Sequence, residues 1–312
     1  MKIQGIVAAT FAAYHTDGSV NLDIIPSLVD NLVNDGVSGV YICGTNGEGP
    51  NMTIEERMAV AEAYVKAANK RILVLVHVGH TSIMECKKLA AHAASIGADA
   101  FSSVAAFYFK PTSVQNLVDS MAEIASAAPQ LPFYYYHMPT LTGVGVDMVE
   151  FLRLGEQAIP NLAGVKYTAS TLFEYQACLN YKDGKFDTLF GFDEMLLPAL
   201  AVGAQGAIGS TYTFAAPFYL KVIDCYRAGK AEEARQAQLV MVNVIRAIIK
   251  HPSIAAQRAI MKMLGTDMGN ARLPLVSLSD SAYNELRSDL EALGFFKQLN
   301  DFKQLSDNPV AV

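Results

Sequence analysis

Cysteine is scarce in this sequence, and its placement excludes two kinds of site. The four cysteines, Cys43, Cys86, Cys178 and Cys225, are far apart and form no Cys-x-x-Cys pair. A structural zinc site and a disulfide framework both need closer spacing or recognisable pairs, so neither is expected. We expect the thiols to be reduced, which is typical of a cytoplasmic protein.

Basic clusters and long apolar segments are also missing. The net charge is −6 and no group of Lys and Arg residues offers a surface for phosphates, so nucleic-acid binding is not expected. No segment of about 18 uncharged apolar residues occurs, so we expect no membrane span. The N-terminal stretch runs into His15, Asp17 and Gly18 and lacks the layout of a cleavable signal. The expected partners are small molecules and further copies of the chain.

What the sequence has in abundance is apolar residues in two alternating patterns. Hydrophobic residues make up 52% of the 312 residues, enough for a large core. Short runs rich in Val, Ile, Tyr and Phe alternate with amphipathic stretches, which is typical of repeated βα units on a parallel sheet. The predicted strands cover residues 3–11, 36–43, 71–78, 98–105, 132–138, 161–168, 188–192 and 206–211.

Strands of this number, joined by helices, favour a closed (β/α)8 TIM barrel over an open doubly wound sheet. A barrel takes about 250 residues, which leaves room for an extension. Residues 231–250 and 254–264 show the apolar spacing of helices, and Pro252 and Gly265 interrupt them. No linker divides the chain. We therefore predict a single domain, 1–312, with the barrel over about 1–228 and a C-terminal helical extension over about 229–300.

Several predicted helices begin with the same pair of residue types. An oxygen-bearing side chain is followed three residues later by glutamate, an arrangement that satisfies free N–H groups at a helix start. We interpret these residues as helix caps rather than as catalytic groups. The pairs are Thr53 with Glu56, Ser82 with Glu85, Asp147 with Glu150, and Thr171 with Glu174.

The carboxyl ends of the strands form the active face of such a barrel, so the residues there are the candidates for a site. CGTNGEG, residues 43–49, follows the second predicted strand. Its glycines flank Thr45 and Asn46 and let the backbone approach a ligand, and N–H groups there suit a carboxylate or a phosphate. The alternative is a tight turn that needs glycine. The loop is not GxGxxG and lacks the P-loop lysine, so nucleotide binding has little support.

PFYYYHMP, residues 132–139, places three tyrosines in a row on a buried strand. Tyr134 and Tyr136 must share one face and Tyr135 the other. A tyrosine at the strand end serves proton transfer, or all three are core aromatics. His77, His80 and His137 carry no accompanying carboxylate motif, so we expect no metal site.

Lys166 lies in GVKYT, at the end of a short apolar strand. Burial there disfavours the ammonium form, lowers the pKa and frees the amine to attack a carbonyl, which is Schiff-base chemistry. The alternative is a lysine that reaches a structural ion pair.

Two further motifs follow the last two strands. In GFDEM, Asp193 and Glu194 either accept hydrogen bonds from the hydroxyls of a polyol or cap a helix. In GAIGSTY, Ser210 and Thr211 are also candidate caps.

Taken together and in this order, GTNGE, YYYHMP, GVKYT and GFDE with GSTY resemble the N-acetylneuraminate lyase subgroup of the dihydrodipicolinate synthase and N-acetylneuraminate lyase family. The resemblance covers essentially the whole chain. It implies a class I aldolase on a TIM barrel with extra C-terminal helices, usually a homotetramer. The implied reaction cleaves the sialic acid N-acetylneuraminate to pyruvate and N-acetylmannosamine, and it needs no cofactor because the lysine is the electron sink.

The resemblance also implies roles for individual residues. Lys166 matches the lysine that forms an imine with pyruvate, and Tyr136, positioned by Thr45, matches the tyrosine that relays the proton. The loop that holds the pyruvate carboxylate matches Gly44, Thr45 and Asn46. The positions that bind the sugar portion match Thr168, Gly191, Asp193, Glu194 and Ser210.

Two alternatives and three departures remain at this point. Synthases typically follow the tyrosine motif with an arginine that clamps a carboxylate, whereas Thr140 and Leu141 stand here, yet a dihydrodipicolinate synthase or another pyruvate aldolase stays open. A protein that binds a keto acid or a sugar acid without turnover also stays open.

The sequence departs from the family pattern at three positions. Asn46 stands where the family has a hydroxyl residue, and Thr213 stands where asparagine is common. Phe109, beside Tyr108, stands where many members have a second tyrosine. These departures leave the acyl-group and sugar preference open.

Overall fold

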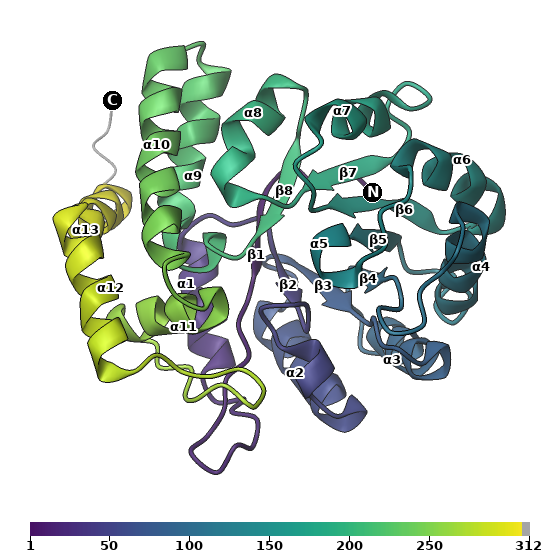
Figure 1. Ribbon diagram of the computed structural model, residues 1–312, viewed down its shortest axis with the longest axis horizontal. Helices are drawn as coiled ribbons and strands as arrows, with labels where there is room; N and C mark the ends of the chain where they lie inside the picture. The colour runs from purple at the N-terminus through teal and green to yellow at the C-terminus, as the bar shows by residue number, and fades with distance from the viewer. Residues whose placement is uncertain (308–312) are drawn as a thin grey trace.

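The computed structural model describes residues 1–307, and its centre is a closed barrel of parallel strands (Figure 1). The strands follow one another around the barrel in chain order, and β1 closes it by pairing with both β2 and β8. The predicted TIM barrel is thereby confirmed. The strands are β1 Gly5–Ala9, β2 Gly39–Ile42, β3 Leu73–His77, β4 Ala100–Val104, β5 Phe133–His137, β6 Leu162–Tyr167, β7 Asp187–Phe190 and β8 Gly206–Gly209.

Helices follow the strands and cover the outside of the barrel (Figure 1). Their bounds are α1 Ile25–Asn34, α2 Ile54–Ala68, α3 Ile83–Ser95, α4 Val114–Ala125, α5 Pro139–Thr142, α6 Met148–Ala158, α7 Leu172–Asn180, α8 Leu196–Ala201 and α9 Tyr212–Arg227. Two short 3-10 helices, η1 Gly49–Asn51 and η2 Asp193–Met195, lie in the loops after β2 and β7. Both of these loops carry residues that the sequence singles out as a candidate site.

Seven of the observed strands lie inside the predicted ranges, and the seventh in chain order, β7, begins one residue earlier than predicted, at Asp187. Most of the strands are also shorter at their ends. The seventh, for example, ends at Phe190, because the chain turns at Gly191 and enters η2. Residues predicted as the last of a strand therefore belong to the loops at the carboxyl end. Their side chains are free to face a ligand rather than the next strand.

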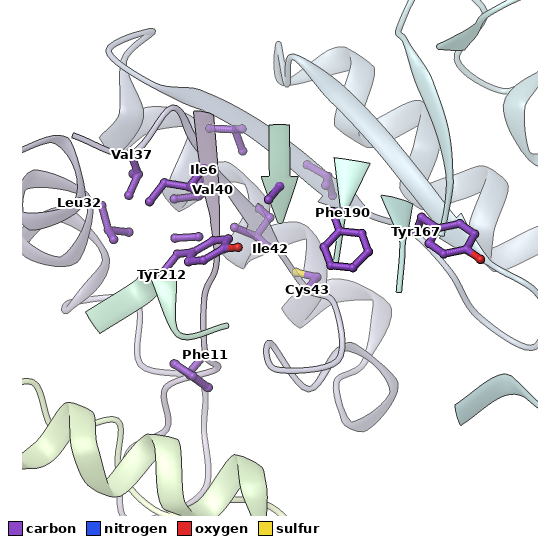
Figure 2. Close-up of a cluster of buried hydrophobic side chains, with 14 of the residues drawn as sticks. Ile6, Phe11, Leu32, Val37, Val40, Ile42, Cys43, Tyr167, Phe190 and Tyr212 are labelled. Carbon is purple, nitrogen blue, oxygen red and sulfur yellow. The ribbon is translucent and has the colours of Figure 1, made fainter. Parts of the chain in front are cut away.

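Apolar side chains fill two cores, one on each side of the strands. Ile6, Val40 and Phe190 point outward and pack under the helices, where Figure 2 shows them with Leu32 of α1. The inner core fills the barrel itself. It contains Ile3, Val7, Ala9, Tyr41, Leu75, Ala100, Tyr134, Tyr136, Leu189 and Ile208.

The three consecutive tyrosines of β5 divide between these cores as predicted. Tyr134 and Tyr136 belong to the inner core, while Tyr135 belongs to the outer one and stacks at 4.6 Å between ring centroids on Phe151 of α6. The alternation of a strand therefore places Tyr136 inside the barrel, close to its carboxyl end.

Three of the four predicted caps are present, and one prediction is wrong. Thr53 and Glu56 form a complete capping box at α2, whereas Ser82 and Asp147 each accept one backbone N–H at α3 and α6. Thr171 makes no cap at α7, because its partner Glu174 is engaged elsewhere. That carboxylate accepts hydrogen bonds from the Tyr167 hydroxyl at 2.5 Å and the Met148 N–H at 3.0 Å.

The C-terminal extension contains four helices that gather at one side of the barrel (Figure 1). They are α10 Ala231–Ile248, α11 Ser253–Met263, α12 Asp280–Ala292 and α13 Phe295–Asp307. The breaks fall where predicted, since α11 begins after Pro252 and ends before Gly265. Across residues 1–307 no single helix is long and apolar enough to cross a membrane, although α10 and α11, bent by 113°, pass that test together.

Candidate active site

A cavity of about 460 Å³ lies at the carboxyl end of the barrel and collects nearly all of the predicted site residues. They come from the ends of five different strands or from the loops that follow them, which explains why they are distant in sequence. The predicted residues that line the cavity are Thr45, Asn46, Tyr136, Lys166, Thr168, Gly191, Asp193, Glu194 and Ser210.

Gly44 is the one predicted binding residue that is not part of the cavity lining. A Cβ atom at this position would lie 2.5 Å from the Tyr41 ring, so glycine is needed for the loop to pack against β2. Its carbonyl oxygen accepts a hydrogen bond from the N–H of Gly49 at 3.1 Å. Gly44 therefore supports the conformation of the loop without lining the cavity.

Lys166 projects from β6 into the barrel and is only 4% exposed. Its Nζ lies 3.9 Å from the ring centroid of Tyr41 and 4.0 Å from that of Tyr136. Burial lowers the pKa of Lys166 to about 7, and the carboxylate of Asp193 opposes part of that shift. Within residues 1–307 no carboxylate comes within ion-pair distance of this amine, so the structural ion pair considered above is not formed. A large share of the lysine is thus neutral and nucleophilic near pH 7.

Tyr136 stands beside this amine, and its hydroxyl donates to the sulfur of Met138 at 2.8 Å. The hydroxyl of Thr45 contacts the same sulfur at 3.7 Å. Burial raises the pKa of Tyr136 to about 12, although the hydroxyls of Thr45 and Thr168 lower it in part. The structure therefore brings Thr45 close to Tyr136 as predicted, but through Met138, whose role the sequence did not indicate.

Asp193 is buried at the cavity floor and is held by the residue that begins α9. Its Oδ2 accepts from the backbone N–H of Thr211 at 2.8 Å and from the Thr211 hydroxyl at 2.7 Å. Burial raises the pKa of Asp193 to about 6. The Thr211 side chain does not cap α9, so the capping interpretation of that residue is wrong. Asp193 does not cap η2, but it accepts the backbone N–H at the start of α9. The carboxylate is instead locked in one orientation in the cavity.

Two glycines make room for the polar groups of the cavity. A Cβ on Gly191 would lie 1.9 Å from the hydroxyl oxygen of Thr168, and one on Gly209 would lie 1.6 Å from Oδ1 of Asp193. The Thr168 hydroxyl is buried close to the Tyr136 hydroxyl, but within the described residues it makes no hydrogen bond of good geometry. It is therefore free to bind a polar group of a ligand.

The loop that carries Thr45 and Asn46 is tightly constrained. Cys43 and Glu48 adopt left-handed conformations, with φ of 56° and 47°, which are uncommon for residues other than glycine. The Asn46 carbonyl accepts from the N–H of Ala12 at 3.3 Å, and the Thr45 carbonyl from the N–H of Glu48 at 3.1 Å. The strained backbone is thus held by hydrogen bonds on both sides.

One wall of the cavity comes from the C-terminal extension, which sequence reasoning did not connect with the site. It is mostly apolar, but Gln257 is a buried exception: its Nε2 donates to Ser253 at 3.1 Å, and its Oε1 has no partner among residues 1–307. Helical spacing indicated α10 and α11 without indicating which face meets the barrel. The apolar lining residues are Ile245, Ile248, Ile249, Ile254, Leu275 and Val276.

The histidines take structural positions. His77 Nδ1 donates to the Cys43 carbonyl at 3.1 Å, and His80 Nδ1 accepts from the Ser82 N–H at 2.9 Å. His137 lies between aromatic rings, and burial lowers its pKa to about 4. In the described part of the chain, no group of three or more His, Cys, Asp or Glu residues is arranged to hold a metal ion.

Two of the departures noted in the sequence lie outside the cavity. The Thr213 hydroxyl donates to the carbonyl of Ala9 at 3.2 Å in the interior. Tyr108 and Phe109 are 77% and 85% exposed and pack edge to face against each other. Only Asn46, the third departure, faces the cavity.

The arrangement combines a neutral amine, a tyrosine hydroxyl and a polar loop within one cavity. A neutral amine adds to the carbonyl of a keto acid and forms an imine, which then draws electrons from the neighbouring bond. A hydroxyl at the same place accepts or returns a proton. The geometry therefore suits the making or breaking of a carbon–carbon bond next to a ketone.

Comparisons with known proteins place this geometry among enzymes. A model described as the Dihydrodipicolinate synthetase family matches residues 2–293. The N-acetylneuraminate lyase of Xenopus tropicalis is 39% identical over 289 residues, which are 91% of this chain and 94% of the relative.

Among solved structures, a lyase is more similar to this chain than a synthase is. The N-acetylneuraminate lyase (sialic acid aldolase) from Aliivibrio salmonicida has a TM-score of 0.92 and 39% identity, covering 95% of this chain and 98% of the other. A dihydrodipicolinate synthase from Aquifex aeolicus has a TM-score of 0.86 and 26% identity, covering 94% and 98%. The chain is thus more similar to these two lyases than to this synthase.

Proposed function

Because the chain belongs to the dihydrodipicolinate synthetase family, we propose that it is a class I aldolase that cleaves N-acetylneuraminate to pyruvate and N-acetylmannosamine. The observation that carries the proposal is the buried amine of Lys166, which lies between two tyrosine rings inside the cavity and has a pKa of about 7. An amine in this state is ready to form an imine without a metal or an organic cofactor.

In the first step, the neutral amine of Lys166 attacks the C2 ketone of the open-chain sugar acid. Water leaves, and the C=N bond of the protonated imine becomes the electron sink. The loop with Thr45 and Asn46 holds the carboxylate next to C2, so that the ketone carbon faces the amine. Such alignment supplies several kcal/mol of the barrier reduction.

In the second step, Tyr136 takes the proton of the C4 hydroxyl, with help from the substrate carboxylate, and the C3–C4 bond breaks. The electron pair of that bond moves into the imine and gives an enamine, while C4 becomes the aldehyde carbon of N-acetylmannosamine. Protonation at C3 and addition of water then release pyruvate and the free lysine. Burial raises the pKa of Tyr136 to about 12, so its hydroxyl is protonated at rest. It therefore takes the C4 proton only as it passes its own proton to the substrate carboxylate, which later supplies the proton for C3.

The polar side of the cavity favours a neutral sugar over a second acid. Thr168, Asp193, Glu194 and Ser210 offer hydroxyl and carboxylate oxygens to the hydroxyls of a polyol. Lys166 is the only Lys or Arg among the described residues that line the cavity. Thr140 and Leu141 follow the tyrosine motif, where synthases typically have a clamping arginine. The carboxylate of an acidic aldehyde would find no counter-charge here and would meet Asp193 and Glu194 instead.

Reductive trapping tests the proposal. When the protein is treated with pyruvate and borohydride, we expect the mass of a reduced pyruvyl adduct, located by peptide mass spectrometry on Lys166. Absence of the adduct, or an adduct on another lysine, would overturn the proposal.

The pH dependence of turnover follows from the state of Lys166. Below its pKa of about 7 the amine is protonated and cannot attack, so kcat/KM for pyruvate release is expected to fall steadily as the pH drops from 8 to 5.5. Protonation of Asp193, whose pKa is about 6, acts in the same direction. A coupled assay with added pyruvate as its control measures this profile. A flat profile over that range would contradict the pKa assigned to the amine.

The role of Asp193 in holding the sugar is tested by Gly209→Ala. The added Cβ would lie 1.6 Å from Oδ1 of Asp193 and push the carboxylate off Thr211. We expect KM for N-acetylneuraminate to rise about tenfold, the equivalent of about 1.4 kcal/mol, while pyruvate still forms its adduct. Gly145→Ala is the matched control, because its Cβ would meet only Pro139, at 3.8 Å. Equal KM values in both variants would argue against Asp193 as a sugar ligand.

The remaining alternatives are separated by two assays. A dihydrodipicolinate synthase would condense pyruvate with aspartate semialdehyde and release no pyruvate from N-acetylneuraminate. A binding protein would bind the sugar acid, measured by calorimetry, without any product. The proposed lyase releases pyruvate and is trapped by it.

Assembly, location and domain organisation complete the proposal. A homotetramer is supported by large apolar side chains exposed on the surface, among them Met84, Tyr108, Phe109 and Phe173, and light scattering tests it. A cytoplasmic location is supported by four free, buried cysteines and is tested by cell fractionation. A single domain over 1–312, with the barrel over about 1–228 and helices over about 229–300, is supported by α10 packing along α9 and by α11 walling the cavity.

A further inference from the structure

A buried ion pair lies directly behind the loop that carries Thr45 and Asn46. Glu48, in the same loop, accepts from Nη1 of Arg258 at 3.0 Å. The two side chains are 0% and 5% exposed, so water does not screen the pair. Arg258 comes from α11 in the C-terminal extension, 210 residues away in sequence.

The same guanidinium also holds two backbone segments through three carbonyls. It donates to the carbonyl of Ala12 in the loop after β1, and to the carbonyls of Met268 and Gly269 at 2.7 and 2.9 Å. The N–H of Ala12 in turn donates to the Asn46 carbonyl at 3.3 Å. Arg258 thus reaches the loop by two routes, one through Glu48 and one through Ala12.

Glu48 occupies a backbone conformation that needs such support. Its φ of 47° lies in the left-handed region, where a glutamate is strained, and the next residue begins η1. The Glu48 N–H donates to the Thr45 carbonyl at 3.1 Å, so a shift of Glu48 moves Thr45 directly. Neither Glu48 nor Arg258 lines the cavity itself. Any effect of the pair on a ligand is therefore transmitted through the loop.

We propose that Arg258 is a positioning residue for the carboxylate-binding loop, acting through Glu48 and Ala12 to set where Thr45 and Asn46 meet the keto-acid end of the substrate. This inference rests on the proposed function, because it assumes that the loop binds the pyruvate carboxylate. It gives the C-terminal extension a second role besides walling the cavity. One cation on α11 couples the extension to the reacting end of the ligand.

Two variants test the proposal in the condensation direction, where pyruvate and N-acetylmannosamine have separate KM values. Glu48→Gln keeps the size of the side chain and removes its charge, and Arg258→Lys keeps the charge but loses the branched contacts of the guanidinium. We expect each variant to raise KM for pyruvate about tenfold to hundredfold, as misplacement of a binding group by about 1 Å does. KM for N-acetylmannosamine should stay within about twofold of the wild-type value, because the proposed sugar contacts come from the loops after β6, β7 and β8 and not from this loop.

Arg272→Lys is the matched control. Arg272 lies on the segment after α11 and, like Arg258, over the Tyr14 ring, at 4.5 Å from the ring centroid against 5.6 Å for Arg258. Its guanidinium pairs with Glu56 and donates to the carbonyls of Gly18 and of Asn51 in η1, but it makes no hydrogen bond to the loop carboxylate of Glu48. We expect this control to lower the melting temperature without changing either KM.

The outcomes distinguish a failure of the proposed function from a failure of the positioning role of Arg258. If the wild-type protein forms no adduct with pyruvate, the proposed function fails. If it does, and the variants melt earlier but keep the wild-type KM for pyruvate, the pair is only structural and this inference fails. Equal increases in both KM values overturn it as well. Should Glu48→Gln not fold, the KM ratio of Arg258→Lys decides alone.

Discussion

Replacing Lys166 with methionine is expected to abolish the pyruvate adduct and all turnover that depends on it, while making the fold more stable near neutral pH. The loss of activity follows because methionine has no nucleophile with which to form an imine. The gain in stability follows because burial of the lysine amine in the protein interior costs free energy. Its Nζ is stripped of water between two tyrosine rings, whereas methionine fits an apolar interior of similar volume.

The sign of the stability effect depends on pH in a defined way. The lysine pKa is 10.5 in an unfolded chain and about 7 in the folded protein, so the unfolded state holds the proton more tightly. The resulting destabilisation is fully present below pH 7, amounts to about 5 kcal/mol there, and disappears as the pH rises past 10.5. The advantage of the methionine variant should shrink over the same range.

Urea unfolding at several pH values between 6 and 10.5 measures this difference. Lys221→Met serves as the control, because Lys221 lies exposed on α9, and neither its activity nor its stability should change by much. A methionine variant that is less stable than the wild type throughout this range would show that burial of the amine is not costly. A variant that still traps pyruvate would remove Lys166 from the mechanism.

Replacing Tyr136 with phenylalanine is expected to slow sugar-acid cleavage by about 10²-fold to 10⁴-fold and to leave the pyruvate adduct intact. The hydroxyl is needed to take the proton from the C4 hydroxyl, whereas the amine can still form an imine without it. The ring that packs against Lys166 at 4.0 Å remains in place. Steady-state pyruvate release and borohydride trapping, measured on the same sample, separate the two steps.

Tyr134→Phe is a closely matched control for this variant. Tyr134 lies on the same strand and the same inner face as Tyr136, but its hydroxyl donates to Asp187 at 2.9 Å, at the opposite end of the strand. Its loss leaves a buried carboxylate with one donor fewer, which costs about 1–3 kcal/mol of stability. Turnover should stay close to that of the wild type. If both variants lose activity equally, the effect is one of packing and Tyr136 is not the proton relay.

The sequence predicts the barrel well because its signals are local. Strands rich in Val, Ile and Tyr, such as β3 and β5, are buried on both faces and read as short continuous apolar runs. The placement of Lys166 near the end of such a run follows from the same pattern, and so does the inward direction of Tyr136. Errors concern strand ends and the cap at Thr171, where tertiary partners of Glu174 override the local motif.

The parts of the site that could not be predicted depend on contacts between distant segments. Met138 contacts both Thr45 and Tyr136, but a methionine next to a proline gives no signal of this in the sequence. Gln257 and Arg258 lie on a helix whose apolar spacing is compatible with several orientations. Only the folded chain shows that one of them faces the cavity and the other the loop behind it.

The wall built by the C-terminal extension also gives the pocket an order of assembly. Lys166 and all eight strands precede residue 210, whereas the wall residues begin at Ile245. A chain emerging from the ribosome therefore carries its lysine and its tyrosines before it carries the wall. Until α10 and α11 have emerged and folded, the cavity lacks its apolar side. The last part of the chain to be synthesised thus completes the pocket.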